Sequence, residues 1–269
     1  MNLLRLTITA AFLMPAFAPA QWLHYPTAGI PRTADGKPDL SAPAPRTADG
    51  KPDFSGIWSM SCQMGNATVM CAPEIAVARV FANVGQELKD GAPYQPWAAD
   101  VVKTTRANNR PNDPLTHCLP TGIVRQHTFP LYKRFVQVPG LLLILNELNA
   151  GYRQIFTDGR PLPADPSPSF NGYSSAKWDG DTLVVETAGF RDGLWLDSGG
   201  SPLTDAARIT ERFRRANYGK LQIEITVDDP KAYTKPWTIH VDQVIVLDTE
   251  LMDYICLENE KDVPHLVVK

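Results

Sequence analysis

The second half of the chain alternates apolar and polar residues in short segments that are separated by turn residues. The series begins at Arg134-Phe-Val-Gln-Val-Pro-Gly and ends near Leu251-Met-Asp-Tyr-Ile-Cys. Alternation with a period of two indicates strands that bury one face, and such strands without long helical patterns between them are typical of an antiparallel barrel or sandwich. Because small closed barrels bind their ligands inside or at the mouth, the pattern also indicates where a functional site would lie.

Nine segments carry this pattern and are predicted as strands: 132–138, 140–148, 152–157, 174–179, 182–188, 207–215, 220–227, 237–247 and 251–257. Pairs such as Asp179-Gly180 between two of the segments are strong hairpin signals. The predicted fold class is therefore mainly β: an antiparallel, calycin/lipocalin-like closed barrel with one or two accessory helices. A two-sheet β-sandwich is the alternative.

Two helices and one long loop interrupt the strands. Residues 73–89 have apolar positions at helical spacing and end before Gly91, and residues 96–108 carry a weaker pattern of the same kind. We therefore predict a single barrel domain over 54–269 with a helical insertion near 73–108. Residues 160–173 contain four prolines, and a loop of that length in a compact domain is often functional.

The N-terminal region has two parts. Residues 1–20 combine a positive start, an apolar run and small residues before Gln21, which is the order of a signal peptide and predicts a secreted, periplasmic or extracellular protein. Residues 21–53 are rich in proline and contain the duplication Arg32-Thr-Ala-Asp-Gly-Lys-Pro-Asp39 and Arg46-Thr-Ala-Asp-Gly-Lys-Pro-Asp53. Since these are turn residues, we expect an extended arm outside the barrel.

Charge and cysteine content narrow the partners and the compartment. The formal net charge of −3 disfavours nucleic acid as a partner, and no second apolar run is long enough for a membrane span. Four cysteines in an exported chain favour disulfides, and four cysteines allow three pairings. The short separation of the first pair makes Cys62–Cys71 and Cys118–Cys256 the predicted pairing.

Glu211 is the strongest candidate for buried chemistry. In segment 207–215 it shares the apolar face with Ile209 and Phe213. A buried carboxylate needs a counter-charge, for which Arg153 is the best candidate. Glu211 is then either a general acid/base or ligand anchor, or half of a structural ion pair.

Other polar groups are weaker candidates. Gln243 lies in an apolar row and would bind a ligand or satisfy a buried neighbour. Arg125 and His127 would lie on one side of an extended segment, where Arg125 could bind a ligand and His127 could act as acid or base, although both could be ordinary loop residues. No His or Cys spacing indicates a metal site.

Several longer motifs resemble a known family. These are Thr47-Ala-Asp-Gly-Lys-Pro-Asp-Phe-Ser-Gly-Ile-Trp58, Cys118-Leu-Pro-Thr-Gly122, Tyr152-Arg-Gln-Ile-Phe-Thr-Asp-Gly-Arg-Pro-Leu-Pro163, Trp178-Asp-Gly-Asp-Thr-Leu-Val-Val-Glu-Thr187, Thr210-Glu-Arg-Phe-Arg-Arg215, Asp228-Asp-Pro-Lys-Ala-Tyr-Thr-Lys-Pro-Trp237 and the segment 254–262. Together they resemble a large family of secreted, uncharacterised bacterial β-rich proteins. The resemblance implies a secreted β-rich domain and no particular activity. The chain departs from relatives at Phe170 and Ala176, where they often have Trp and Gly, and at Leu162, Tyr173 and Leu203, where some have histidines.

Two functions remain open from the sequence. The first is an exported barrel that binds a small, partly apolar or aromatic ligand, with Tyr152 and Trp178 among the binding residues. The second is an enzyme, of lyase, isomerase or hydrolase type, that uses the same cavity for acid/base chemistry. We expect no cofactor, because the motifs that bind nucleotides are absent.

Overall fold

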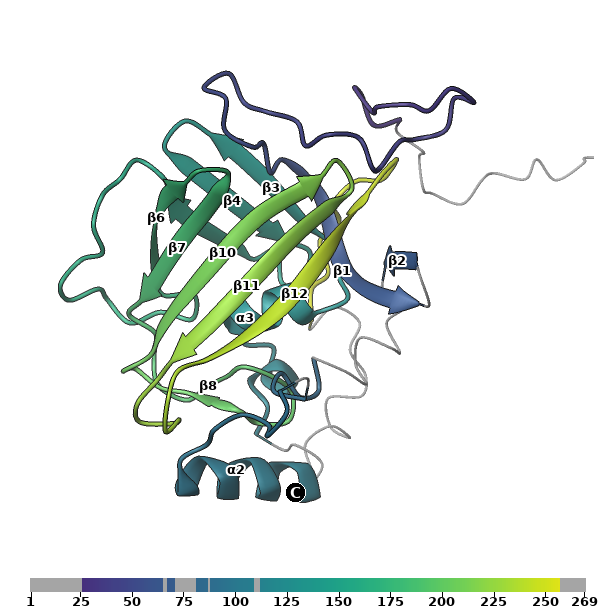
Figure 1. The fold of residues 1–269 in the computed structure, drawn as a ribbon. Helices are drawn as coiled ribbons and strands as arrows, with labels where there is room; N and C mark the ends of the chain where they lie inside the picture. The colour runs from purple at the N-terminus through teal and green to yellow at the C-terminus, as the bar shows by residue number, and fades with distance from the viewer. Residues whose placement is uncertain (1–25, 65–66, 71–80, 87, 109–111, 257–269) are drawn as a thin grey trace, which may run out of the picture.

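The computed structural model describes residues 26–64, 67–70, 81–86, 88–108 and 112–256. They form a closed barrel of nine strands with accessory helices (Figure 1). The barrel strands are β1 (Gly56–Met64), β3 (Lys133–Val138), β4 (Leu141–Asn146), β5 (Tyr152–Phe156), β6 (Tyr173–Asp179), β7 (Thr182–Ala188), β10 (Arg208–Asn217), β11 (Lys220–Asp228) and β12 (Trp237–Val246). The predicted closed barrel is confirmed, and the sandwich alternative is wrong.

The barrel closes through β1, a strand that the sequence pattern did not reveal. β1 pairs with β3 on one side and with β12 on the other, so that no barrel edge stays open. The predicted last strand, 251–257, is wrong for the residues described: 251–256 form only a bridge between Tyr254 and Leu148. A short strand, β2 (Ala67–Met70), pairs antiparallel with the end of β1, and β8 (Leu194–Trp195) pairs with β9 (Pro202–Leu203) outside the barrel.

One strand pair breaks the antiparallel pattern. β5 and β6 run parallel, with Ile155 opposite Ser174 and Phe156 opposite Ser175. All other pairings between barrel strands are antiparallel. A parallel pair needs a crossover connection, which the proline-rich loop 157–172 provides. Both strands therefore begin at the same end of the barrel.

The barrel interior is packed with side chains. Alternation holds in β10, where Ile209, Glu211 and Phe213 are fully buried while Arg212 and Arg214 lie on the other face. Aromatic rings fill the centre, and the Phe213 ring lies between those of Phe54 and Phe135 at centroid distances of 6.3 and 6.2 Å. The interior is thus a core rather than an open ligand chamber.

Helices cover one end of the barrel. The predicted helix 96–108 is confirmed as α2 (Pro96–Ala107). The predicted helix 73–89 is wrong where the structure describes it, because 81–86 and 88–89 form turns, in which Gln86 N donates to Asn83 O and Leu88 N donates to Gly85 O. Residues 73–80 and 87 lie outside the described residues. A 3-10 turn, η1 (Pro114–His117), leads to α3 (Gly122–Thr128), a helix that the sequence did not indicate. Figure 1 shows α3 at the end of the barrel that faces α2.

The N-terminal arm lies outside the barrel at the opposite end (Figure 1). Each copy of the duplicated octapeptide closes into the same loop: the arginine Nη1 of Arg32 or Arg46 donates to the carbonyl of Gly36 or Gly50 at 2.7 Å. Among the residues that the structure describes, only the second copy is ion-paired to the barrel, through Arg46 and Asp181. Residues 1–25, which include the predicted signal peptide, lie outside the described residues.

Candidate functional site

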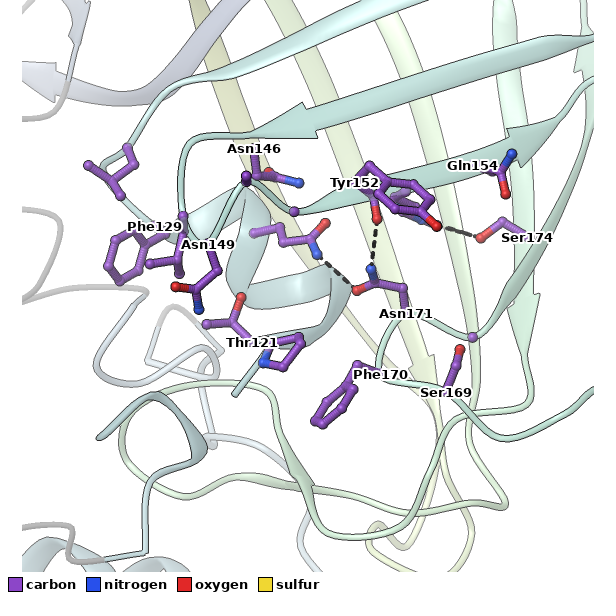
Figure 2. A pocket seen from close by; sticks show the side chains of 18 of the residues that line it. Thr121, Phe129, Asn146, Asn149, Tyr152, Gln154, Ser169, Phe170, Asn171 and Ser174 are labelled. Carbon is purple, nitrogen blue, oxygen red and sulfur yellow. Dashed lines mark hydrogen bonds between the residues drawn. The ribbon is translucent and has the colours of Figure 1, made fainter. Parts of the chain in front are cut away.

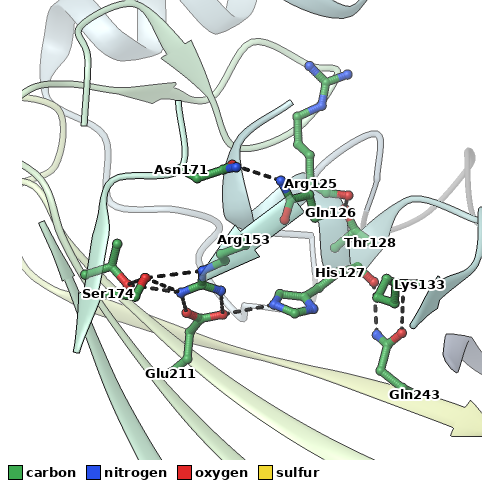
Figure 3. A network of polar contacts seen from close by, with 11 residues as sticks. Arg125, Gln126, His127, Thr128, Lys133, Arg153, Asn171, Ser174, Glu211 and Gln243 are labelled. Atoms are coloured by element: carbon green, nitrogen blue, oxygen red, sulfur yellow. Dashed lines mark hydrogen bonds and ion pairs between the residues drawn. The ribbon is translucent and has the colours of Figure 1, made fainter. Parts of the chain in front are cut away.

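A buried ion pair links β5 and β10 inside the barrel. Arg153 Nη1 donates to Glu211 Oε1 at 3.0 Å, and Arg153 Nη2 donates to Glu211 Oε2 (Figure 3). Both side chains are at most 1% exposed. The strand register predicted from the sequence therefore places Glu211 correctly, and the arginine opposite it is the one that was expected.

Arg153 also contacts two hydroxyl groups. Ser174 Oγ lies 3.3 Å from Nε and 3.1 Å from Nη2, Thr187 Oγ1 lies 3.0 Å from Nη2, and the two hydroxyls lie 2.9 Å apart. Side chains from β6, β7 and β10 thus meet at one guanidinium of β5. Several polar partners around a buried charge are typical of a pair that holds a core together.

His127 approaches the same carboxylate from α3. Its Nε2 lies 2.9 Å from Glu211 Oε1. Burial alone would raise the pKa of Glu211, but the charge of Arg153 and the hydrogen bonds from His127 and Arg153 outweigh burial and lower that pKa to about 2. Glu211 is therefore ionised and can only accept, so Nε2 carries the hydrogen of the bond.

The other ring nitrogen of His127 has no partner. Burial lowers the pKa of His127, and the attraction of Glu211 offsets this effect only in part, so the ring is neutral near pH 7. With the proton on Nε2, Nδ1 is a bare acceptor, and it is buried without a hydrogen bond to any described residue. The network of Arg153, Glu211 and His127 therefore carries one charge of each sign and one unused acceptor.

A second polar pair lies beside this network. Lys133 Nζ donates to Gln243 Oε1 at 2.9 Å, and Gln243 Nε2 donates to the backbone carbonyl of His127 at 3.0 Å (Figure 3). Burial lowers the pKa of Lys133 to about 7. Gln243 thus satisfies buried neighbours, which was one of its two predicted roles, and it anchors α3 to β3 and β12.

The structure separates Arg125 from His127. Residues two apart on a helix point in directions about 200° apart, so the expected shared side of an extended segment is wrong. Arg125 turns away from the barrel and pairs with Asp113 at 2.6 and 3.0 Å, and its guanidinium carbon lies 5.1 Å from the centre of the Phe81 ring. Arg125 is fully buried in this pair, which fixes η1 to α3.

A cavity of about 580 Å³ opens where β5 and β6 begin (Figure 2). Its walls come from α3, the β4–β5 turn, the outer face of β5 and the loop before β6. They combine aromatic rings with carboxamides, which are Gln126, Phe129, Tyr132, Asn146, Asn149, Tyr152, Gln154, Phe156, Phe170, Asn171 and Tyr173. The buried Arg153 and Ser174 belong to the same wall, so the cavity borders the ion network.

Hydrogen bonds fix the orientation of two of these carboxamides. Asn171 Nδ2 donates to the backbone carbonyl of Tyr152 at 3.1 Å, so Asn171 presents its oxygen to Gln126. Gln126 Nε2 donates to that oxygen at 2.8 Å. Because a backbone carbonyl can only accept, the chain of bonds has one direction, and Gln126 Oε1 takes no part in it.

Two polar atoms in the cavity wall lack partners. Gln126 Oε1, an acceptor, and Asn146 Nδ2, a donor, are buried and make no hydrogen bond to any described residue. An unpaired buried polar atom costs about 1–3 kcal/mol, and such atoms are mostly found where water or a ligand supplies the missing bond. Both atoms have almost no accessible surface, so a bound molecule would reach them only after the side chain of Gln126 or Asn146 turned toward the cavity.

The other predicted ligand residues divide between cavity and core. Tyr152 lines the cavity with 63% of its surface exposed. Trp178 does not line it; its ring stacks on Phe54 at 5.5 Å, and Lys51 lies over it. The sequence missed Gln126, Asn146 and Phe170, although the length of loop 160–173 was a signal for part of this wall.

The disulfide Cys118–Cys256 borders the same region. It joins η1 to the C-terminal segment, and Asn149 braces both ends: Nδ2 donates to the Cys118 carbonyl at 3.2 Å and Oδ1 accepts from Cys256 N at 3.0 Å. This half of the predicted pairing is confirmed. Cys71 lies outside the described residues, so the pairing Cys62–Cys71 stays a prediction.

Three further findings bear on the class of protein. Within the described part of the chain, no helix is long and apolar enough to cross a membrane. Across the same residues, no three His, Cys, Asp or Glu side chains gather as metal ligands. Comparison with protein-family models and with curated proteins finds no match, so the family resemblance of the sequence motifs stays a prediction.

Proposed function

We propose that this protein binds a small molecule in the cavity at the start of β5 and β6. The observation that carries the proposal is one cavity whose wall combines aromatic rings with carboxamides, among them Gln126 and Asn146, each of which keeps one atom without a described partner. The volume of about 580 Å³ falls in the range of ligand sites, which combine apolar walls with a few placed polar groups. The site lies at the end of the barrel, because side chains fill the interior.

The compartment is part of the proposal. A disulfide such as Cys118–Cys256 forms and persists in oxidising surroundings. Together with the signal-like first 20 residues, it supports a protein that acts in the periplasm or outside the cell. The ligand would then be a molecule that the cell meets there.

The alternative, acid/base catalysis by Glu211 and His127, has less support. Neither residue belongs to the cavity wall, and a pKa of about 2 keeps Glu211 ionised under ordinary conditions. A general acid or base must reach the proton that it transfers. We therefore assign the ion network to the framework beneath the cavity.

The test is nuclear magnetic resonance on the isotopically labelled protein with phenol, cyclohexanol, benzoate and glucose as probes. We expect at least one probe to shift the side-chain amide signals of Asn146 and Gln126. The amide of Asn217, the last residue of β10, serves as an internal reference. If no probe moves the two cavity amides, the proposal is wrong.

Asn146→Leu separates binding from folding. Replacing an unpaired buried amide by an apolar group of similar size should leave the melting temperature unchanged or raise it, while the response to the probe is lost. If the variant instead loses stability together with its response to the probe, Asn146 has a structural role, and this result would count against the site.

A further inference from the structure

We infer that the ligand of this cavity is a neutral saccharide of one or two rings. This inference rests on the proposed binding function and adds the chemical class. Three properties of the wall support it: its charge balance, the state of its aromatic rings and the kind of hydrogen bond that it leaves open.

The residues that line the cavity include no unpaired charged side chain that could bind an ionic ligand. Its lining residues include no Asp or Glu, and its one ionic side chain, Arg153, is already paired with Glu211. At the rim, Arg160 is paired with Asp158. Because a charge that leaves water needs a partner, these walls favour an uncharged molecule.

The aromatic rings of the wall also bear on the class of ligand that can bind. The guanidinium carbon of Arg160 lies 4.0 Å from the centre of the Phe156 ring, and that of Arg191 lies 4.6 Å from the centre of the Phe170 ring. These side chains already occupy the positions at which a cationic ligand would bind an aromatic face. Tyr152 is different, since its ring is largely exposed and stacks on no other described ring. It offers a free apolar face with a polar tip.

The open hydrogen bonds point to hydroxyl groups. Gln154 presents an exposed carboxamide on β5, and Gln126 and Asn146 place two further carboxamides in the wall, each with one atom that pairs with no described residue. A carboxamide has both a donor and an acceptor, and neighbouring hydroxyls on one ring can pair with both. Hydrocarbons and alkyl chains would leave these groups unpaired. A sugar ring combines such hydroxyls with an apolar face that fits against Tyr152.

The experiment compares saccharides with the other probe classes on the same amide signals. The saccharides are glucose, galactose, xylose, N-acetylglucosamine, cellobiose and maltose, and the comparison probes are phenol, benzoate and hexylamine. We expect a saccharide to shift the amides of Asn146 and Gln126 at lower concentration than any comparison probe. The titration of the best saccharide then gives its Kd.

Matched variants test the role of the ring. Tyr152→Ala should weaken saccharide binding about tenfold, whereas Tyr152→Phe should keep most of it because the stacking face remains. Trp97→Ala, which removes an exposed aromatic residue of α2 outside the cavity wall, is the control and should leave Kd unchanged.

The outcomes distinguish the two proposals. If phenol, benzoate or hexylamine shifts the cavity amides and no saccharide does, the saccharide inference is wrong and the binding function stands. If no probe of any class shifts them, both are wrong. Equal weakening by Tyr152→Ala and Trp97→Ala would also overturn the inference, because the effect would then not come from the cavity.

Discussion

Glu211 shows how one buried carboxylate organises several elements. Its two oxygens receive Arg153 from β5 and His127 from α3, and all three side chains are at most 2% exposed. A pair of this kind contributes little beyond an apolar substitute of the same volume, but the loss of one partner leaves an uncompensated charge. The residue is therefore expected to be sensitive to substitution.

Glu211→Gln should lower the free energy of unfolding by about 3–5 kcal/mol, because Arg153 would stay buried without a counter-charge. Chemical denaturation at pH 7 measures the change. The folded-state pKa of about 2 lies below the usual 4.5, so the wild-type stabilisation is present above pH 4.5 and is lost as the pH falls toward 2. The variant should lack this acid dependence.

The control for that variant is Asp181→Asn, which breaks the exposed pair with Arg46. Exposed ion pairs contribute little because water screens them, so the denaturation midpoint should barely move. Equal effects of the two substitutions would show that the interior pair is not formed as described.

Lys133 should give a pH dependence of the same sign in an alkaline range. Burial lowers its pKa from 10.5 to about 7, so between these values the unfolded chain binds the proton that the folded chain has released. Stability therefore rises with pH from about 7 to 10.5. In Lys133→Met this rise should be absent, and denaturation at several pH values between 7 and 10 measures the difference. A wild-type profile that is flat over this window would contradict the burial of a neutral lysine.

At the level of single residues, the sequence predicts the face of a strand on which a side chain lies better than it predicts the residues that the side chain meets. The alternation with a period of two placed Glu211 and Gln243 on the inside. A shift of the register by one residue would have placed both on the outer face. It could not reveal that Gln126 and Asn146 share one cavity, because they come from α3 and β4 and meet only through the closed fold.

At the level of elements, errors arose where local preference and tertiary structure disagree. α3 contains Ile123, Val124 and Thr128, which favour strands, and it is only seven residues long. Its stability comes from packing on the barrel end rather than from propensity. β1 was missed for a related reason: the predicted domain begins at residue 54, but only the pairing with β12 shows that the segment after it is a strand that closes the barrel.

The duplicated arm offers a matched pair of substitutions. Phe54 and Leu40 occupy equivalent positions after the two copies, yet Phe54 is fully buried and Leu40 is 43% exposed. Phe54→Ala should cost about 3–5 kcal/mol of unfolding free energy through the cavity that it leaves, whereas Leu40→Ala should cost little. Urea denaturation of both variants measures this, and comparable losses would contradict the different packing of the two copies.

At the level of the whole molecule, two closures hold the chain in place. The first is the pairing of β1 with β12, which joins the ends of the sheet through residues almost 190 positions apart, such as Ile57 and Val246. Contacts this distant cannot be inferred from local patterns, and they make folding depend on late, long-range pairing. The second closure is covalent.

The Cys118–Cys256 disulfide should stabilise the folded chain chiefly by restricting the unfolded one. It closes a loop with a sequence separation of 138, for which the chain-entropy relation gives about 5 kcal/mol. We expect the double variant Cys118→Ser, Cys256→Ser to unfold at a clearly lower urea concentration while its barrel still unfolds in one transition. Because Asn149 joins both cysteines to the cavity wall, the same variant should respond more weakly to the cavity probes. A loss of less than about 1 kcal/mol would show that the unfolded chain is already compact around this link, and the disulfide would then serve the cavity rather than the fold.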